Sequence, residues 1–342
     1  MKGTLLLVSA RADAALRDEI AAGRRPRTEF LELERTHHVE LLDWSRLGRP
    51  SRRSGMLSIR HALAALPRLS KYQVVFSDGE HIGIPLALAM GILGPVRPHV
   101  VIGHWLTAPK KRAFFRTLHA DRHMTRIIAH SRTQILNAVK DLGISPHRFD
   151  FVPYNADPEF WRPVGHPEQR LIVSAGIEHR DYALLDRTCD GIDAELFIAA
   201  GSLYSPAAVC TLPRSTTRAV VRPLDHLRLR DLYDKAAVVV VPLLANDFQA
   251  GVTTLLEAMA MGKAVVVSGT EGQRDIVDHG ETGMLVTPGD ERALRDTLVD
   301  LLRDPAERAR LGYNARRAVQ ERFSLDRYVD ALARNISAAA AS

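Results

Sequence analysis

The chain has 342 residues, a formal net charge of +6 and 46% hydrophobic residues. This length exceeds the size at which one hydrophobic core usually stops growing, so we expect two globular domains. Its two cysteines, Cys189 and Cys210, and its histidines form no cluster with the spacing of metal ligands, so the sequence supports neither a disulfide framework nor a structural zinc site. This cysteine usage favours a reducing, cytoplasmic setting.

Positive charge is concentrated in the first half of the chain. Residues 1–160 contain 24 Lys and Arg against 15 Asp and Glu, whereas residues 161–342 contain 22 against 25. The asymmetry indicates an anionic ligand, or an anionic lipid surface, for the first half. An arginine-rich composition without such a partner explains the counts equally well, because only seven of the 46 cationic residues are lysine.

Short runs rich in Val, Ile and Leu alternate with helical patterns, which is typical of parallel sheets covered by helices on both faces. In the first half we expect strands at residues 4–10, 37–44, 72–79, 99–105, 126–131 and 149–154. The segment SRTQ (131–134) has the pattern of a capping box, in which Ser131 and Gln134 each bind the other's backbone amide. With Gly143 as a stop signal, it predicts a helix at 132–142.

Residues 155–170 contain three prolines and no apolar periodicity, which predicts a linker. Beyond it we expect strands at 170–176, 194–201, 217–223, 236–243, 263–269 and 283–288. Asp290, Asp304 before Pro305, and Ser324 are expected to cap the helices that follow them. The pattern predicts an α/β fold with two Rossmann-like domains, residues 1–160 and 161–342, around a cleft.

The segment NDFQAGVTTLLEAMAMG (246–262) begins as a loop and continues as a helix. It follows the expected strand 236–243, and ligands of open α/β sheets bind outside the carboxyl ends of the strands. Gly251 leaves room beside the backbone, and the free amides of residues 251–254, including Val252, form an expected anion site that suits phosphate.

Thr253 and Thr254 precede Glu257 by four and three residues, so the three side chains are expected on one helix face. A carboxylate one turn below a phosphate can accept hydrogen bonds from the two hydroxyls of a ribose. Gln249 can then reach sugar hydroxyls beyond a diphosphate. On the alternative interpretation, Glu257 is a surface residue and Gly251 an ordinary helix breaker.

Residues 249–290, QAGVTTLLEAMAMGKAVVVSGTEGQRDIVDHGETGMLVTPGD, resemble the donor-binding region of family-4 glycosyltransferases, which are retaining enzymes of the GT-B fold. Further segments have counterparts there: SDGEHIGIPLAL (77–88), AHSRTQ (129–134), VPYNADPEFWRP (152–163) and LRDLYDKAAVVVVPL (229–243). The resemblance implies a GT-B architecture in which two Rossmann-like domains face each other across a cleft. Residues 1–160 would bind the acceptor, and residues 161–342 the nucleotide-sugar donor.

By this resemblance Glu257 is the ribose ligand, and Gln249 stands where the family has a glutamate that contacts the transferred sugar. Arg180 aligns with a lysine that binds the diphosphate, a role that its bidentate fork suits. Ile177 replaces the arginine of that diphosphate clamp, and Arg222 is a candidate to compensate. The two departures leave open a degenerate, inactive site.

In the first half, His104 ends an expected strand where the family often has a histidine near the reacting anomeric carbon. A structural histidine beside Trp105 is the alternative. Asp78 and Glu80 also follow a strand and could contact the acceptor, although capping the next helix is the role we expect for Asp78. The family's Gly-Gly loop after the first strand is absent.

Two basic stretches, residues 46–60 and 106–116, are candidates to guide a phosphate-bearing or lipid-linked acceptor, with an amphipathic helix behind the first. Solvated arginine faces explain them as well, and no interleaved aromatic residues support nucleic acid. The apolar run 82–96 is too short and too broken to span a bilayer. We expect a cytoplasmic protein with peripheral contact at the inner membrane face.

Together these features predict a metal-independent, cofactor-free retaining glycosyltransferase that moves a hexosyl group from a UDP- or GDP-sugar to an unidentified acceptor. The catalytic candidates are His104, Gln249 and Arg180, and no Asp-x-Asp motif occurs for a metal. One alternative is a sugar-nucleotide epimerase or hydrolase of the same fold. The other is a non-catalytic nucleotide-sugar-binding protein.

Overall fold

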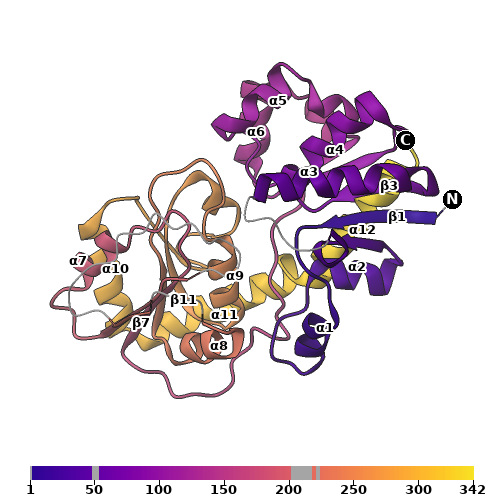
Figure 1. The fold of residues 1–342 in the computed structure, drawn as a ribbon. Helices are drawn as coiled ribbons and strands as arrows, with labels where there is room; N and C mark the ends of the chain where they lie inside the picture. Colours follow the sequence, from indigo (N-terminus) through magenta and orange to yellow (C-terminus); the bar gives the residue numbers. More distant parts are fainter. Residues whose placement is uncertain (1, 48–53, 202–217, 221–223) are drawn as a thin grey trace. The chain divides into compact units, whose positions relative to one another are not determined.

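The computed structural model describes residues 2–47, 54–201, 218–220 and 224–342, which form two compact units (Figure 1). Unit 1 comprises Met1–Ala22, Arg27–Pro153 and Asp326–Ser342, and unit 2 comprises Gly23–Pro26 and Tyr154–Leu325. Each is a parallel sheet with helices, so the expected two-domain α/β fold is confirmed.

Unit 1 is built, within the described residues, on a six-stranded parallel sheet of order β2-β1-β3-β4-β5-β6. The strands are β1 (Lys2–Val8), β2 (Glu40–Asp43), β3 (Tyr72–Ser77), β4 (His99–Gly103), β5 (Arg126–Ala129) and β6 (Phe149–Phe151). In β1, Leu5, Leu6 and Leu7 are all buried, as expected of a strand covered on both faces. The register pairs Leu7 with Ser77, so β1 and β3 end side by side.

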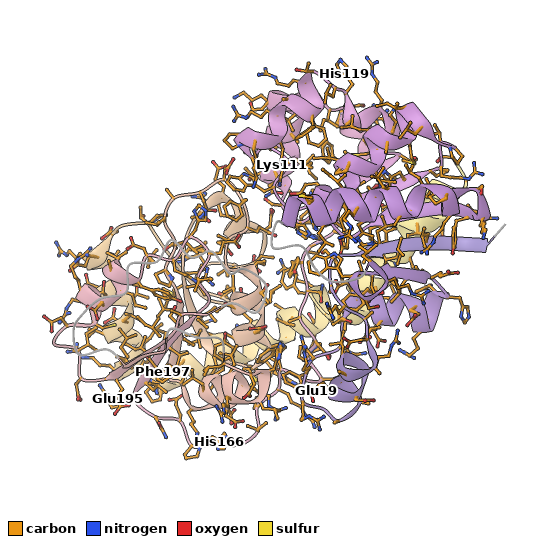
Figure 2. All side chains as sticks on the ribbon, in the orientation of Figure 1. Glu19, Lys111, His119, His166, Glu195 and Phe197 are labelled. Atoms are coloured by element: carbon orange, nitrogen blue, oxygen red, sulfur yellow. The ribbon has the colours of Figure 1, made fainter. Side chains whose placement is uncertain are left out.

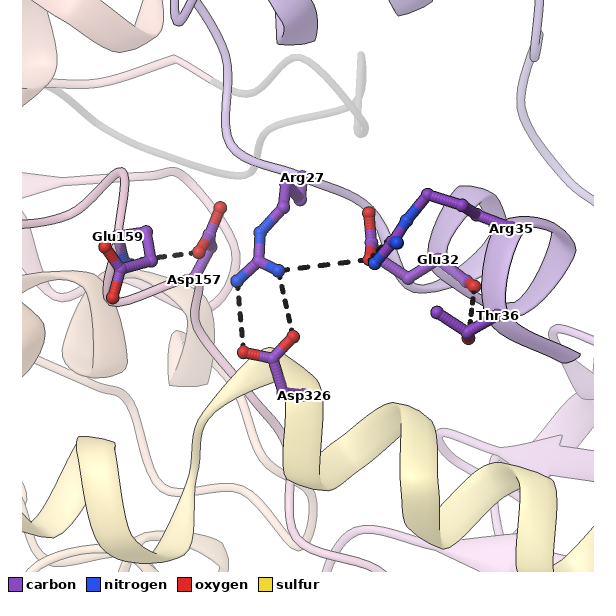
Figure 3. Close-up of polar contacts among 7 residues, drawn as sticks. All are labelled: Arg27, Glu32, Arg35, Thr36, Asp157, Glu159 and Asp326. Atoms are coloured by element: carbon purple, nitrogen blue, oxygen red, sulfur yellow. Dashed lines mark hydrogen bonds and ion pairs between the residues drawn. The ribbon is translucent and has the colours of Figure 1, made fainter.

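The α-helices of unit 1 are α1 (Ala14–Ala21), α2 (Glu29–His37), α3 (Ser54–Ala65), α4 (Glu80–Leu93), α5 (Arg112–Arg116), α6 (Arg132–Leu142) and the C-terminal α12 (Leu325–Ala340). Short 3-10 turns are η1 (Trp44–Leu47), η2 (Leu66–Lys71), η3 (Pro109–Lys111), η4 (Ala120–His123) and η5 (Pro146–Arg148). Helix α12 returns to this unit from the far end of the chain. Its first residues are tied there by two hydrogen bonds between Arg27 and Asp326, of 2.9 and 3.2 Å, and Arg27 also approaches Glu32 (Figure 3).

Unit 2 contains a second parallel sheet, whose described strands have the order β12-β11-β10-β7-β8-β9. They are β7 (Leu171–Ala175), β8 (Glu195–Ala199), β9 (Arg218–Val220), β10 (Val238–Val241), β11 (Ala264–Ser268) and β12 (Met284–Val286). Its helices are α7 (Tyr182–Cys189), α8 (His226–Lys235), α9 (Val252–Ala260), α10 (Glu291–Arg303) and α11 (Pro305–Arg322), with the 3-10 turn η6 (Glu271–Asp275). From the other edge the order is that of a Rossmann sheet, with its reversal between β7 and β10.

All twelve expected strands are present. Strand β1 has the expected length but begins and ends two residues earlier, and residues 217 and 221–223 of the expected strand 217–223 lie outside the described residues. The other ten strands are shorter than their sequence patterns. Helix 132–142 is confirmed and ends at Gly143 in the left-handed region, with φ of 71°. Asp290 and Asp304 cap α10 and α11 through their side chains, as expected. The capping box at 131–134 is wrong: Ser131 makes no capping bond, and Gln134 donates instead to the backbone oxygen of His104.

The division of the chain differs from a single cut at residue 160/161. The main part of unit 2 begins at Tyr154. Gly23–Pro26 belong to unit 2 although the residues on either side belong to unit 1, and Asp326–Ser342 belong to unit 1 although they follow unit 2 in the sequence. Helix α12 belongs to unit 1 because its apolar side chains, including Tyr328 and Leu332, are buried, and the Tyr328 ring lies against His130. The strand pattern alone does not reveal such a return. No helix in the described ranges is both long and apolar enough to cross a bilayer.

Candidate functional site

The candidate donor site lies at the reversal of the unit 2 sheet. Strands β7 and β10 are neighbours there, and their carboxyl ends lead into Gly176 and into the loop before α9. A reversal of this kind leaves a crevice above the strand ends, where α/β proteins bind ligands. The segment 246–262 reaches this position, as its sequence predicts.

The Arg180 side chain occupies the centre of this position and is only 4% exposed. Its Nε donates to the backbone oxygen of Ala175 at 3.0 Å, and its Nη1 donates to that of Glu178 at 3.0 Å. Its Nη2 donates to the Thr254 hydroxyl at 3.2 Å. A guanidinium has five N–H donors, so two remain for an anionic ligand. The fork is thus fixed in orientation before any ligand arrives.

Two glycines make room for the guanidinium. Gly251, the N-cap of α9, has φ of +74°, and Gly176 has φ of +88°, conformations that favour glycine. A Cβ at Gly176 would lie 2.7 Å from Nη2 of Arg180, and a Cβ at Gly251 would collide with the same guanidinium. The space that Gly251 provides at the helix mouth is therefore filled by Arg180.

The first turn of α9 places its residues unequally. Val252 and Thr254 are buried, whereas Thr253 is exposed. Helix α9 spans Val252–Ala260, so both threonines lie about one turn before Glu257, as expected, but only Thr254 bonds to Arg180. The backbone amides of the first turn lack acceptors within the helix, which suits an anion beside the Arg180 fork.

Glu257 is partly buried one turn further along α9. The Tyr233 hydroxyl donates to its Oε2 at 3.4 Å and also interacts with the Thr254 side chain. Burial raises the pKa of Glu257 to about 8, although the Tyr233 hydrogen bond opposes the shift. Burial thus favours the protonated carboxyl group in the neutral range.

Gln249 and the turn η6 are joined through hydrogen bonds. The Gln249 Nε2 donates to the backbone oxygen of Gly272 at 3.0 Å, and its Oε1 is buried without a partner among the described residues. Gln273, fully buried, donates its Nε2 to the backbone oxygen of Ala250 at 2.7 Å. The loop before α9 and η6 thus form one connected structure.

In unit 1, the reversal lies between β1 and β3, and Asp78 follows β3 there. Its Oδ2 accepts hydrogen bonds from the backbone amide and the hydroxyl of Ser9, the latter at 2.7 Å. Burial raises the pKa of Asp78 to about 6. The expected capping role is wrong: Gly79 is the N-cap of α4, because the Asp78 side chain turns back toward the adjacent end of β1.

The Glu80 carboxylate binds the backbone of His104 and Trp105. It is 3% exposed and accepts hydrogen bonds from the amides of His104 and Trp105, at 2.9 and 3.1 Å. Lys111, which is labelled in Figure 2, donates to Oε1 of Glu80 and to the backbone oxygen of Trp105. Although burial opposes it, His104 and Lys111 lower the pKa of Glu80 to about 2. Its oxygens are thus occupied within the protein.

The His104 side chain is exposed at the end of β4. Its Nε2 lies 3.1 Å from the backbone oxygen of Asp78, which can only accept, so Nε2 carries the proton of this hydrogen bond. The ring lies 5.5 Å from that of His130, whose pKa burial lowers to about 3. His104 is therefore held through its amide, its carbonyl and its ring.

The structure adds residues that the sequence did not single out. Tyr233 joins Glu257, and Tyr182 donates its hydroxyl to the Gly176 oxygen at 2.5 Å. Gln273 acts through Ala250. Only the position of Gly176 directly after a strand could have indicated its role. Ile177 packs in the hydrophobic core of unit 2, and Arg222 lies outside the described residues.

Residues 180–304 match the model of the family "Glycosyl transferases group 1". The chain is 26% identical over 241 residues to the MMP alpha-(1->4)-mannosyltransferase of Mycolicibacterium hassiacum, covering 66% of this chain and 58% of that protein. It is 25% identical over 255 residues to the D-inositol 3-phosphate glycosyltransferase 1 of Catenulispora acidiphila, covering 66% and 60%. The chain therefore matches less than two thirds of the length of either protein.

Solved structures with the same fold include Anabaena Alr3699/HepE in complex with UDP and glucose, with a TM-score of 0.71, 16% identity, and coverage of 98% of this chain and 100% of that one. Sucrose-phosphate synthase from Thermosynechococcus elongatus has a TM-score of 0.71 and 17% identity, over 99% and 100% of the two chains. At these identities the likeness concerns the fold alone. The chain is therefore a GT-B protein similar to family-4 glycosyltransferases, with a Glycosyl transferases group 1 region at residues 180–304.

Proposed function

We propose that this protein is a retaining, metal-independent glycosyltransferase that moves a hexosyl group from a UDP- or GDP-sugar to an acceptor bound by unit 1. Arg180 and the first-turn amides of α9 would bind the diphosphate, and Glu257 the ribose. The donor sugar would lie beside the loop that carries Gln249, and His104 would be the catalytic residue that unit 1 supplies.

This proposal depends mainly on the position of the Arg180 guanidinium, which lies between Gly176, Gly251 and Thr254. Three internal hydrogen bonds fix the guanidinium at a helix N-terminus, where fixed donors stabilise negative charge without reorganisation. Charge develops on the departing nucleoside diphosphate during glycosyl transfer. An arginine and helix amides can take the place that a divalent cation has in other transferases.

The relatives support transfer over the two alternatives. The mannosyltransferase and the inositol phosphate glycosyltransferase are named for transfer, and Alr3699/HepE was solved with UDP-glucose. A substrate of the same class for this chain would place a nucleotide in unit 2. The Gln249 substitution does not argue for decay, because the Gln249 amide has a defined hydrogen bond to Gly272.

Activity is tested by incubating the full chain with UDP-glucose or GDP-mannose, with and without a panel of hexoses, inositols, sugar phosphates and lipid-linked sugars. We expect nucleotide release that depends on one acceptor class, continues in excess EDTA, and gives a product with the donor's anomeric configuration by NMR. Consumption without an acceptor would favour the epimerase or hydrolase alternative. Binding without turnover across the panel would favour the non-catalytic one.

We also propose peripheral membrane contact through α3. Met56, Ile59 and Leu63 lie at helical spacing and are 52, 51 and 48% exposed, and Arg60 is also exposed on this helix. A helix with an exposed apolar face and cations binds anionic interfaces. In flotation assays we expect binding to phosphatidylglycerol vesicles but not to phosphatidylcholine vesicles, and loss of binding in Ile59→Glu. Equal recovery of wild type and variant with the vesicles would refute the proposal.

A further inference from the structure

Two glutamines exchange hydrogen bonds across the loop that precedes α9. Gln249 donates to the backbone oxygen of Gly272, and Gln273 donates to that of Ala250. Each glutamine is thus bound to the chain neighbour of the other. We call this arrangement the amide latch, formed by Gln249, Ala250, Gly272 and Gln273.

The chemistry of the acceptors sets the orientation of both side chains. A backbone oxygen only accepts, so each side chain must turn its NH₂ group toward it and its Oε1 away. Both Oε1 atoms are buried without a partner among the described residues. A glutamate at either position has no donor for the carbonyl when ionised, so the latch requires amides.

The latch depends on a close approach of the two segments. A Cβ at Gly272 would lie 2.8 Å from the backbone oxygen of Phe248 and 3.0 Å from Cγ of Gln249. Gln273 is fully buried, and Ala250 is buried as well. The loop therefore has little freedom while the two bonds persist.

Arg180 is held independently of the latch. Its hydrogen bonds go to Ala175, Glu178 and Thr254, none of which belongs to the latch. Loss of a latch bond would therefore loosen the loop beside the donor sugar while the diphosphate and ribose ligands stay in place.

We infer that Gln273 is a positioning residue that, through the amide latch with Gln249, holds the loop before α9 in the geometry that receives the donor's sugar. This inference rests on the proposed function. It assigns glutamine at position 249 a specific role, where the resemblance to family-4 glycosyltransferases implies a glutamate.

The test measures the affinity of the full chain for UDP, UDP-glucose, GDP and GDP-mannose by calorimetric titration. The variants are Gln273→Met, Gln249→Met and the double substitution, with Gln320→Met, an exposed position on α11, as the matched control. Methionine keeps the side-chain length but cannot donate. We expect nucleotide affinity to change less than about twofold, and the added affinity of the sugar nucleotide to fall about tenfold in each single variant. The double variant should lose little more, because the bonds are coupled.

The possible outcomes separate this inference from the proposed function. If both single variants bind the nucleotide and keep the wild-type ratio of sugar-nucleotide to nucleotide affinity, the inference is wrong and the proposed function stands. If the variants lose nucleotide and sugar-nucleotide affinity equally, the latch has a general structural role, and the inference about the donor sugar is wrong. Absence of nucleotide binding by the wild type would refute both. If Gln273→Met does not fold, Gln249→Met tests the same latch from its less buried side.

Discussion

Among the single residues of the site, Glu257 is the proposed ribose ligand, and its pKa is far above that of an ordinary glutamate. Burial raises its pKa to about 8. Ribose hydroxyls donate to the ionised carboxylate, so nucleotide binding should favour the deprotonated form. The affinity for the preferred nucleoside diphosphate should therefore increase about tenfold between pH 7 and pH 9.

The control for this pH dependence is Glu257→Gln, which should bind more weakly and lose the increase. Calorimetric titration at several pH values, in buffers of different ionisation enthalpy, also detects the proton released on binding. A pH-independent wild type, or an unchanged slope in the variant, would remove Glu257 from the ribose site.

Gln249→Glu introduces the residue that the resemblance to family-4 glycosyltransferases implies for this position. We expect it to weaken sugar-nucleotide binding by about tenfold, because a carboxylate would face the Gly272 oxygen and lose the hydrogen bond that the amide donates. The measurement is the ratio of UDP-glucose to UDP affinity, or the GDP-mannose equivalent. Tighter sugar-nucleotide binding by the variant would instead show that position 249 has lost a useful carboxylate.

At the scale of elements, the mouth of α9 depends on a residue without a Cβ. In Gly251→Ala the new methyl would collide with the Arg180 guanidinium and impose a left-handed backbone on alanine. We expect a stability loss of about 1 to 3 kcal/mol and weaker nucleotide binding. Gly289→Ala is the matched control: its φ is +81°, but nothing lies within 4 Å of the added Cβ.

Urea unfolding and nucleotide titration of the two variants separate backbone strain from the collision. If Gly251→Ala and Gly289→Ala lose the same stability and both keep the nucleotide affinity of the wild type, the added methyl does not displace Arg180. That result would contradict the close fit of Arg180 against Gly251.

Most elements could be predicted from the sequence because their causes are local. A buried parallel strand is an almost continuous apolar run, and Asp caps act within one helical turn, so β10 and the N-terminus of α10 followed from nearby residues. The capping box at Ser131 failed because Gln134 has a long-range acceptor, the His104 oxygen. The partner of Asp78, Ser9, is likewise 69 residues away.

The same distinction between local and long-range causes applies to the candidate site. The positions of Gly251 and Glu257 followed from the motif, since spacing along α9 is local, and that of Arg180 from the resemblance alone. Tyr233 and Gln273 could not be recognised, because only the fold brings α8 and η6 to α9.

At the scale of the whole molecule, the chain completes unit 1 with its last helix. Leu332 of α12 is fully buried, although it lies far in sequence from the rest of that unit. Leu332→Ala should destabilise unit 1 by about 2 to 5 kcal/mol, whereas Arg334→Ala, at an exposed position of α12, should have little effect. Hydrogen exchange should become faster in β1 and β5 and stay unchanged in β7 and β10. Faster exchange confined to unit 2 would contradict the assignment of α12.

Nucleoside diphosphate binding by unit 2, through Arg180 at the N-terminus of α9, is the step on which the proposed function depends. It is tested most directly by calorimetric titration of the full chain with UDP, GDP, ADP and dTDP, for wild type, Arg180→Met and Arg292→Met. Arg292 is 93% exposed on α10 and controls for the loss of one positive charge. We expect one nucleotide to bind wild type and Arg292→Met alike, and to bind Arg180→Met at least about tenfold more weakly. Binding of no nucleotide to the wild type, or equal binding to all three proteins, would contradict it.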